Sequence, residues 1–456
     1  MASPAAANPR PRIISPVPDP NTPKRCLVIR WGAVGDAIQA SSLFPQLKAD
    51  GWQVWVDVNE MGEQVLRHDP HLSGILVSPL GRIPEGKITE HVTHRALGFG
   101  RLIMLNDMTE GALIKQPDRV DYYWPDAVRR RECAVNFVEY LHRVADVSYA
   151  GGCQQRFYST PTEQAQARAF VGPRRPVILW AIAGSHQHKV WPGLSRAMAR
   201  VLHETDAHIV VTGGPETKDL WDSTLAFLLD YHRDIDRRMT ALIGSHPIRQ
   251  IMSLAQAATV VVGPETGILN AMAMEPNGKV ALLSHSSKVN LTRDWLHTTT
   301  IEPDASVAPC WPCHRMHPST VNCPQHEMTK LALCMSSITV DRVVDAIKDA
   351  LASQAEAAVV KAAPFVAPPP APEPVVTLVI KTDEKAAKEA MQRLGEAAKS
   401  LGTELHAEQL KKAAETAKRI AEQPLILKRR DPKPPAKPSR VRAVATRARV
   451  RKRPKE

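Results

Sequence analysis

Short apolar runs alternate along the chain with stretches in which apolar positions recur at helical spacing. Residues 26–30 form a β-rich run closed by a glycine turn, and helical periodicity then continues to Leu47, so the pattern predicts strand, turn and helix. Gln53–Val58 predicts a second strand, and residues 76–77 and 102–105 predict further strands. Repeated alternation of this kind is typical of a parallel, doubly wound α/β sheet.

A second series of the same kind begins with the apolar run Pro176–Ala183. The elements that follow are strand candidates at residues 208–212, 259–263 and 279–283, and helix candidates at residues 193–204, at 248–258 and from Gly267. The sequence therefore predicts a second α/β domain, joined to the first by a linker at residues 158–175. A ligand would bind in the cleft between two such sheets, outside the carboxyl ends of the strands.

The composition changes beyond residue 352, where proline and alanine become frequent. We predict two Rossmann-like domains that face a cleft, followed by a largely disordered C-terminal extension. The full organisation is a disordered N-terminal arm at residues 1–24, Rossmann-like domains at 25–165 and 166–352, a Pro/Ala linker at 353–382, a charged helix at 383–423 and a basic disordered tail at 424–456.

The net charge of +12 is concentrated at the C-terminal end. Thirteen basic and two acidic residues lie between Lys428 and Glu456, so this segment carries +11 and the rest of the chain +1. The segment has no aromatic residue that could stack on a base, so its charge supports non-specific attraction to an anionic partner such as nucleic acid or lipid. A solvated tail without a partner is the alternative interpretation.

Cysteine usage and the N-terminus indicate a cytoplasmic protein. Seven cysteines in 456 residues are too few for a disulfide scaffold. Met1–Lys24 is rich in proline and alanine, and it lacks the basic start and the apolar run of a signal peptide. No stretch approaches the roughly 18 apolar residues that a membrane-spanning helix needs.

Four of the cysteines crowd into the loop at residues 310–334, with the spacing Cys310-x2-Cys313-x9-Cys323-x10-Cys334. Four thiolates can enclose a tetrahedral metal, so a structural zinc site is one interpretation. Unligated or disulfide-capable thiols are a second, and a redox role is a third. A metal here would stabilise the loop and take no part in catalysis.

The first glycine turn, Gly32-x-x-Gly35-Asp36, lies between a strand and a helix N-terminus. Unpaired backbone N–H groups and the helix dipole favour an anion at such a position. Asp36 is equally well interpreted as a helix cap or as a base that accepts a proton from an attacking hydroxyl group.

Three turns follow strands of the second domain. Ser185 and Lys189 follow the first, and their hydroxyl and ammonium groups could contact a diphosphate. Glu216 follows Gly213-Gly214 and could bind the two hydroxyls of a ribose. Glu265-Thr266-Gly267 puts a hydroxyl and a small residue at a helix N-terminus, which is the geometry of a diphosphate cradle. A basic surface loop, a simple turn and a helix cap are the alternatives, but three such turns in one domain indicate a shared ligand.

Together, the order and spacing of these motifs resemble glycosyltransferase family 9, the ADP-heptose:lipopolysaccharide heptosyltransferases. The motifs are Arg30-Trp-Gly-Ala-Val-Gly-Asp36, Ser185 to Trp191, Gly213-Gly-Pro-Glu216 and Glu265-Thr-Gly267, and the resemblance covers Cys26 to Leu351. It implies a glycosyltransferase-B fold and inverting transfer of a heptose-like sugar, from an ADP-linked nucleotide-sugar donor to a glycan or lipopolysaccharide-type acceptor. It also implies that no cofactor or catalytic metal is required, and that the protein acts in the cytoplasm at the inner membrane face.

The resemblance further implies roles for individual residues. Asp36 matches the family's base, with Gly32 and Gly35 on the acceptor side, so residues 25–165 would form the acceptor domain and residues 166–352 the nucleotide-sugar domain. The matching donor-binding residues are Ser185, Lys189, Glu216, Glu265, Thr266 and Gly267.

Two positions depart from the family pattern. The family usually has Asp-Thr-Gly followed by a histidine, whereas this chain has Glu265 and Asn270. These departures motivate an alternative function, a catalytically inactive binding or scaffold protein of this fold that acts through its C-terminal extension. A third interpretation is a nucleic-acid-associated protein that binds through its basic tail.

Overall fold

The computed structural model describes residues 24–79, 83, 86–106, 124–172, 176–184, 186–231, 235–315 and 323–360. All described residues lie in one unit of the chain, Met1–Thr377. The predicted charged helix at 383–423 and basic tail at 424–456 lie outside the described residues, as does the predicted N-terminal arm apart from Lys24.

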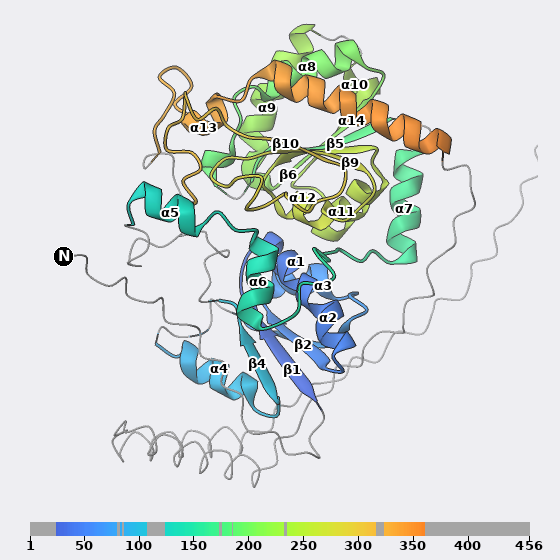
Figure 1. Ribbon diagram of the computed structural model, residues 1–456. Coiled ribbons are helices and arrows are strands. Elements are labelled where there is room, and N and C mark those ends of the chain that lie inside the picture. Colours follow the sequence, from blue (N-terminus) through green and yellow to red (C-terminus); the bar gives the residue numbers. More distant parts are fainter. Residues whose placement is uncertain are drawn as a thin grey trace, which may run out of the picture. The chain divides into compact units, whose positions relative to one another are not determined.

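A four-stranded parallel sheet organises the first half of the described unit (Figure 1). In the order β3-β2-β1-β4, its strands are β1 (Arg25–Ile29), β2 (Gln53–Val58), β3 (Leu72–Val77) and β4 (Arg101–Met104). The intervening helices are α1 (Val34–Ala40), η1 (Ser41–Leu43), α2 (Phe44–Ala49), α3 (Glu60–Leu66) and α4 (Ile88–Ala96). The predicted parallel, doubly wound arrangement is confirmed.

In the described part of the connection to the second sheet, the helices are α5 (Asp126–Glu132), α6 (Phe137–Ala145) and α7 (Pro161–Val171). The last of them begins with a complete capping box, in which Thr160 accepts the backbone N–H of Glu163 and Glu163 accepts that of Thr160. Because α7 packs against α11 (Ile248–Ala257), this connecting helix is part of the second half in space.

A six-stranded parallel sheet organises the second half, in the order β10-β9-β8-β5-β6-β7. The strands are β5 (Val177–Ala181), β6 (His208–Gly213), β7 (Met239–Ile243), β8 (Val260–Pro264), β9 (Gly278–Leu282) and β10 (Thr298–Ile301). The remaining helices are η4 (Gln187–Lys189), α8 (Leu194–Glu204), η5 (Pro215–Thr217), α9 (Lys218–Tyr231), α10 (Ile235–Arg238), α12 (Gly267–Met272), α13 (Leu333–Ser336) and α14 (Val340–Val360). Helix α14 continues past residue 352, where the sequence predicted that the domain ends.

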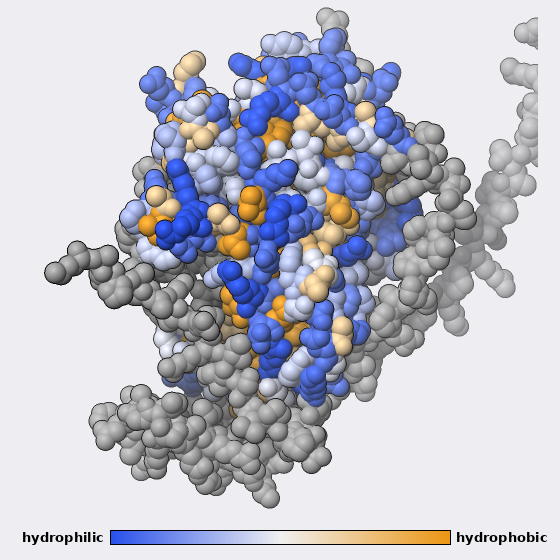
Figure 2. Space-filling model, viewed as in Figure 1, coloured by the Kyte–Doolittle hydropathy of each residue, from blue (hydrophilic) through white to orange (hydrophobic). Residues whose placement is uncertain are grey.

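The surface is polar on the side that Figure 2 shows, with apolar residues scattered across it. Exposed large apolar side chains such as Met61, Tyr231 and Met328 come from different elements, as is normal for a protein surface. Within the described ranges, no helix has both the length and the apolar character needed to cross a membrane.

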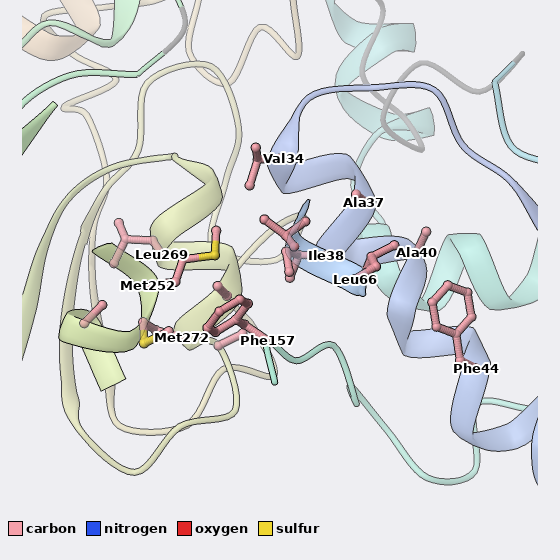
Figure 3. Packing of buried hydrophobic residues seen from close by; sticks show 14 of the residues in the cluster. Val34, Ala37, Ile38, Ala40, Phe44, Leu66, Phe157, Met252, Leu269 and Met272 are labelled. Atoms are coloured by element: carbon pink, nitrogen blue, oxygen red, sulfur yellow. The ribbon is translucent and has the colours of Figure 1, made fainter. Parts of the chain in front are cut away.

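Two clusters of buried apolar side chains form the core. The first contains residues of both halves, among them Ile38 of α1, Phe157 of the connecting segment, and Met252 and Leu269 of α11 and α12. Figure 3 shows these side chains in the region where α1 meets α12. The second cluster includes Trp180 of β5 and fills the space between the second sheet, α8 and α14. The shared first cluster holds the start of α1 close to the start of α12.

Candidate functional site

The turns that the sequence singles out in the second half lie at one edge of its sheet. β8, β5 and β6 are parallel neighbours, so the turns that follow them leave the same edge side by side. These turns contain Lys189, Glu216 and Thr266, whereas Ser185 lies outside the described residues. The topology therefore brings three of the predicted donor-binding elements to one edge.

Lys189 is buried beside the turn that opens α12. Its Nζ donates a hydrogen bond to the backbone oxygen of Glu265 over 3.0 Å. Gly184 leaves room for the side chain of Lys189, because a Cβ at position 184 would lie 2.6 Å from Cδ of Lys189. Thr266 caps α12 by accepting the backbone N–H of Leu269 over 3.4 Å, so its capping interpretation is confirmed. The ammonium group therefore lies next to a helix N-terminus.

The carboxylate of Glu265 is buried and contacts the end of the neighbouring strand β9. Its Oε1 accepts the backbone N–H of Ser284 over 2.5 Å, and its Oε2 lies 3.1 Å from Nδ1 of His285. Nε2 of His188 lies 3.2 Å from the same Nδ1. Sequence reasoning missed Ser284, His285 and His188. Ser284-His285 follows an apolar run as the other site turns do, and this position is the signal that could have identified the pair.

Glu216 stands apart from these contacts. It is exposed in η5, directly after β6. Among the described residues, no hydrogen bond joins its carboxylate to Lys189 or to the turn at Thr266. An exposed carboxylate at a strand end suits the ribose-binding role that the family resemblance implies.

Asp36 is buried at the start of α1 and caps that helix. Its Oδ2 accepts the backbone N–H of Ala33 over 2.7 Å, as the capping interpretation predicts. Its Oδ1 lies 2.5 Å from Nη2 of Arg30, and Nη1 of Arg30 donates to the backbone oxygen of Leu105 over 2.8 Å. Gly32 leaves room for the carboxylate, because a Cβ there would lie 2.3 Å from Oδ2. The neighbouring guanidinium favours the ionised carboxylate, which is the form that a base needs.

The two glycine turns of the two halves meet each other directly. A Cβ at Gly267 would lie 2.7 Å from Cγ1 of Val34 and 3.1 Å from the backbone nitrogen of Gly35. A Cβ at Gly35 would lie 3.2 Å from Nδ2 of Asn270. The start of α1, which carries Asp36, is therefore packed against the start of α12.

Asn270 takes part in this packing. Its Nδ2 donates to the backbone oxygen of Thr266 over 3.0 Å, and Nε2 of Gln155 donates to its backbone oxygen over 2.8 Å. Both side chains are buried. At the position where the family usually has a histidine, this chain thus has a structural amide that links the connecting segment to α12.

The four cysteines of the predicted zinc loop, Cys310, Cys313, Cys323 and Cys334, are free thiols. Burial raises the pKa of Cys313 to about 12 and that of Cys323 to about 11. Within the part of the chain that the structure describes, no group of three or more histidine, cysteine or acidic side chains is arranged to hold a metal ion. The zinc interpretation therefore gains no support from the described residues.

Comparisons with known proteins agree with the resemblance found in the motifs. Residues 113–288 match the model of glycosyltransferase family 9 (heptosyltransferase). The structure of E. coli ADP-heptose lipopolysaccharide heptosyltransferase II is similar with a TM-score of 0.52 and 16% identity, covering 73% of this chain and 99% of that protein. A family 9 glycosyl transferase from Veillonella parvula is similar with a TM-score of 0.53 and 14% identity, covering 72% of this chain and 97% of that protein. A search of curated proteins finds no match. The family 9 resemblance and the two-domain α/β fold are confirmed, and they support glycosyl transfer as the general activity.

Proposed function

Because the chain resembles glycosyltransferase family 9 in motifs and fold, we propose that it transfers a sugar with inversion from a nucleotide-diphosphate donor to an acceptor hydroxyl. The donor that we infer is ADP-linked and heptose-like, and the acceptor is a glycan of the lipopolysaccharide type. Such an acceptor is lipid-linked, so the reaction would take place at a membrane face. The proposed mechanism uses neither a cofactor nor a catalytic metal.

The donor diphosphate would bind at the start of α12. Lys189 brings an ammonium group to this position, and Thr266 and Gly267 begin the helix whose N-terminal N–H groups favour an anion. Glu216 would bind the ribose, and Ser185 would contact a phosphate. These groups stabilise the negative charge that grows on the diphosphate as its bond to the sugar breaks.

The acceptor hydroxyl would lie beside Asp36. Its oxygen attacks the anomeric carbon and forms the new glycosidic bond, while the bonding pair of the anomeric C–O bond leaves with the diphosphate. Asp36 accepts the hydroxyl proton during the attack. Arg30 keeps the carboxylate ionised and correctly oriented before the acceptor arrives.

The contact between Gly35 and Gly267 carries this proposal. It joins the helix that begins with the candidate base to the helix that begins with the candidate diphosphate turn, although the two lie more than two hundred residues apart. A base and a leaving-group site must lie on either side of one reacting carbon, and this packing supports such an arrangement.

Variants of Asp36 test the proposal. We expect Asp36→Asn and Asp36→Ala to abolish transfer from ADP-heptose, measured by ADP release, while calorimetry shows that both variants still bind ADP. Asp219→Asn, a change at an exposed aspartate of α9, is the matched control and should leave transfer unchanged. We expect a chelator to have no effect on the rate.

Two outcomes would contradict parts of the proposal. Unchanged turnover in Asp36→Asn would remove Asp36 from the mechanism. Failure of the unmodified chain to bind ADP or any member of a nucleotide-sugar panel would instead favour the scaffold alternative.

A further inference from the structure

Two half-buried rings lie together at the carboxyl edge of the first sheet. Trp31 follows β1, and its ring centroid lies 5.7 Å from that of His91 in α4. Trp31 stands between Arg30 and Gly32, the two residues that border the carboxylate of Asp36. The pair of rings therefore adjoins the turn that carries the candidate base.

Each ring is held from the inside by a polar side chain at the end of a neighbouring strand. Nε1 of Trp31 donates to Oδ1 of Asp57 in β2 over 3.0 Å, and its backbone N–H donates to Oδ1 of Asn106 over 2.5 Å. Nε2 of His91 lies 2.8 Å from the hydroxyl of Ser78, directly after β3. Asp57 and Ser78 are completely buried, whereas the two ring residues stay half-buried. The pair thus directs these nitrogens inward and leaves mainly apolar surface outside.

Asp57 is a costly anchor, because a buried carboxylate loses its hydration. Burial raises its pKa, while hydrogen bonds from Ser78 and Trp31 and the charge of Arg95 act in the opposite direction. Nε of Arg95 lies 3.4 Å from Oδ2 of Asp57. A carboxylate accepts a stronger hydrogen bond than a neutral oxygen does, so it holds the indole firmly. A ring that is fixed in advance loses little freedom when a ligand stacks on it.

The charge at this edge suits an uncharged ligand surface. Burial lowers the pKa of His91 and the guanidinium of Arg95 adds to this effect, against the opposing carboxylate of Asp57, so the imidazole is neutral at pH 7. Arg95 directs its own donors inward, because Nη2 donates to the backbone oxygen of Val77 over 2.8 Å and Nε faces Asp57. Two uncharged rings offer π faces that attract C–H groups and not the oxygens of a phosphate.

Resting on the function proposed above, we propose that Trp31 and His91 form a platform on which the acceptor sugar stacks. The C–H face of the sugar ring lies against the indole, and one of its hydroxyls reaches Asp36. Asp57 and Ser78 are positioning residues that act through the two rings. Because the platform belongs to the half that carries Asp36, it takes no part in donor binding.

Steady-state kinetics with ADP-heptose and deacylated lipopolysaccharide core oligosaccharide test the platform. We expect Trp31→Ala to raise KM for the oligosaccharide about tenfold or more, because the stacking surface is lost. KM for ADP-heptose and the calorimetric affinity for ADP should not change. Trp52→Ala is the matched control, since it removes a half-buried tryptophan directly before β2, at the opposite edge of the same sheet. It should leave KM for the oligosaccharide unchanged.

Two variants of Asp57 separate positioning of the indole from a merely structural role. Asp57→Ala releases the indole N–H and should raise KM for the oligosaccharide, whereas Asp57→Asn keeps an oxygen that can accept it and should restore most of the affinity. A merely structural role would lower stability in these variants without changing KM for the oligosaccharide.

His91→Ala gives an independent test, because none of the residues of α4 is fully buried and the helix should tolerate the change. We expect a several-fold rise in KM for the oligosaccharide. His94→Ala, at an exposed position of the same helix, is its control and should have no effect. Circular dichroism of each variant checks that it is folded.

Unchanged KM for the oligosaccharide in folded Trp31→Ala would overturn the inference, and so would a loss of ADP affinity, which would assign the ring to the donor. If Trp31→Ala does not fold, unchanged KM in His91→Ala would overturn it alone. Saturation-transfer NMR distinguishes this failure from that of the proposed function. A chain that binds ADP but gives no signal from the oligosaccharide would refute the platform only, whereas a chain that binds no nucleotide would refute the proposed function.

Discussion

Gly35 and Gly267 allow the two halves of the protein to meet backbone to backbone. The atoms around Gly267 that a Cβ would approach most closely are Cγ1 and Cβ of Val34 and the backbone nitrogen of Gly35. Backbone atoms cannot rotate away, so a larger residue at position 267 must push α1 from α12. The spacing between the candidate base and the candidate leaving-group site thus depends on the absence of a Cβ at Gly267.

We predict that Gly267→Ala lowers kcat for transfer by about a hundredfold, because a displacement of the order of 1 Å in an active site can cost that much. Stability should fall as well, because extra atoms forced into a packed contact cost about 1 to 3 kcal/mol. Steady-state kinetics and the thermal midpoint check both statements.

Gly35→Ala is the matched control for this prediction. A Cβ at position 35 would meet Nδ2 of Asn270 at 3.2 Å, and a side-chain amide can move aside. The control should therefore lose much less activity than Gly267→Ala. Equal losses in the two variants would show that helix spacing does not explain the effect.

The candidate site could be predicted from the sequence where its residues follow apolar runs. The turns at Asp36, Lys189 and Thr266 could be identified because each directly follows a buried strand. The link between Gln155 and Asn270 could not be identified, because it depends on a long-range contact that leaves no local pattern. The partners of Glu265 after β9, Ser284 and His285, were missed although they directly follow an apolar run, as the other site turns do.

An ion pair between Glu163 and Arg249 fixes the first turn of helix α7. Arg249 of α11 pairs with Glu163 at 2.7 Å, and it also donates to the backbone oxygens of Gln64 and Tyr158. Burial alone would raise the pKa of Glu163, but hydrogen bonds from Arg249 and from the backbone of Thr160 outweigh it and hold the pKa at about 2.

We predict that Glu163→Gln lowers the free energy of unfolding at pH 7 by about 2 to 3 kcal/mol. The folded pKa lies below the unfolded value, so the contribution is complete above about pH 4.5 and is lost as the pH falls toward 2. The variant should therefore lose less stability than the unmodified chain over this range. Urea unfolding at a series of pH values measures the difference.

Thr160→Ala separates capping from ion pairing in the same helix. It removes the hydroxyl that accepts the N–H of Glu163 but keeps the ion pair with Arg249, so it should cost about 1 kcal/mol and retain the acid sensitivity. If Glu163→Gln kept the full acid sensitivity as well, other carboxylates would be responsible for it.

In the second sheet, the central strands followed from the pattern of apolar residues, whereas the two edge strands did not. β5 and β8 are buried along their whole length and read as continuous apolar runs. β7 and β10 lie at the two edges of the second sheet and are partly exposed. They contain polar residues and so lack the continuous apolar run that predicts a buried strand. The domain end predicted at residue 352 falls inside α14, because alanine-rich sequence suits both a helix and a linker.

The described unit should unfold as one cooperative body although it contains two sheets. Its first apolar cluster contains residues of both halves, and hydrogen bonds cross between them, including those from Phe137 to Asn290 at 2.8 Å and from Tyr149 to Asp294 at 2.7 Å. We predict one calorimetric transition whose calorimetric and van't Hoff enthalpies agree. Two separate transitions, of which ADP raises only one, would show that the halves fold independently.

The C-terminal segment at residues 428–456 should set how the whole protein responds to salt, because it carries +11 of the net charge of +12. Removing it should leave ADP binding unchanged, since the candidate donor-binding residues lie between Ser185 and Gly267, outside this segment. Binding to DNA or to anionic vesicles should weaken, and the slope of log affinity against log salt concentration should become shallower, because fewer counterions are released. If the slope of log affinity against log salt concentration did not change after truncation, basic residues of the folded unit would be the ones that bind the polyanion. Its nearly neutral net charge argues against that, since attraction to a polyanion needs a concentrated positive patch.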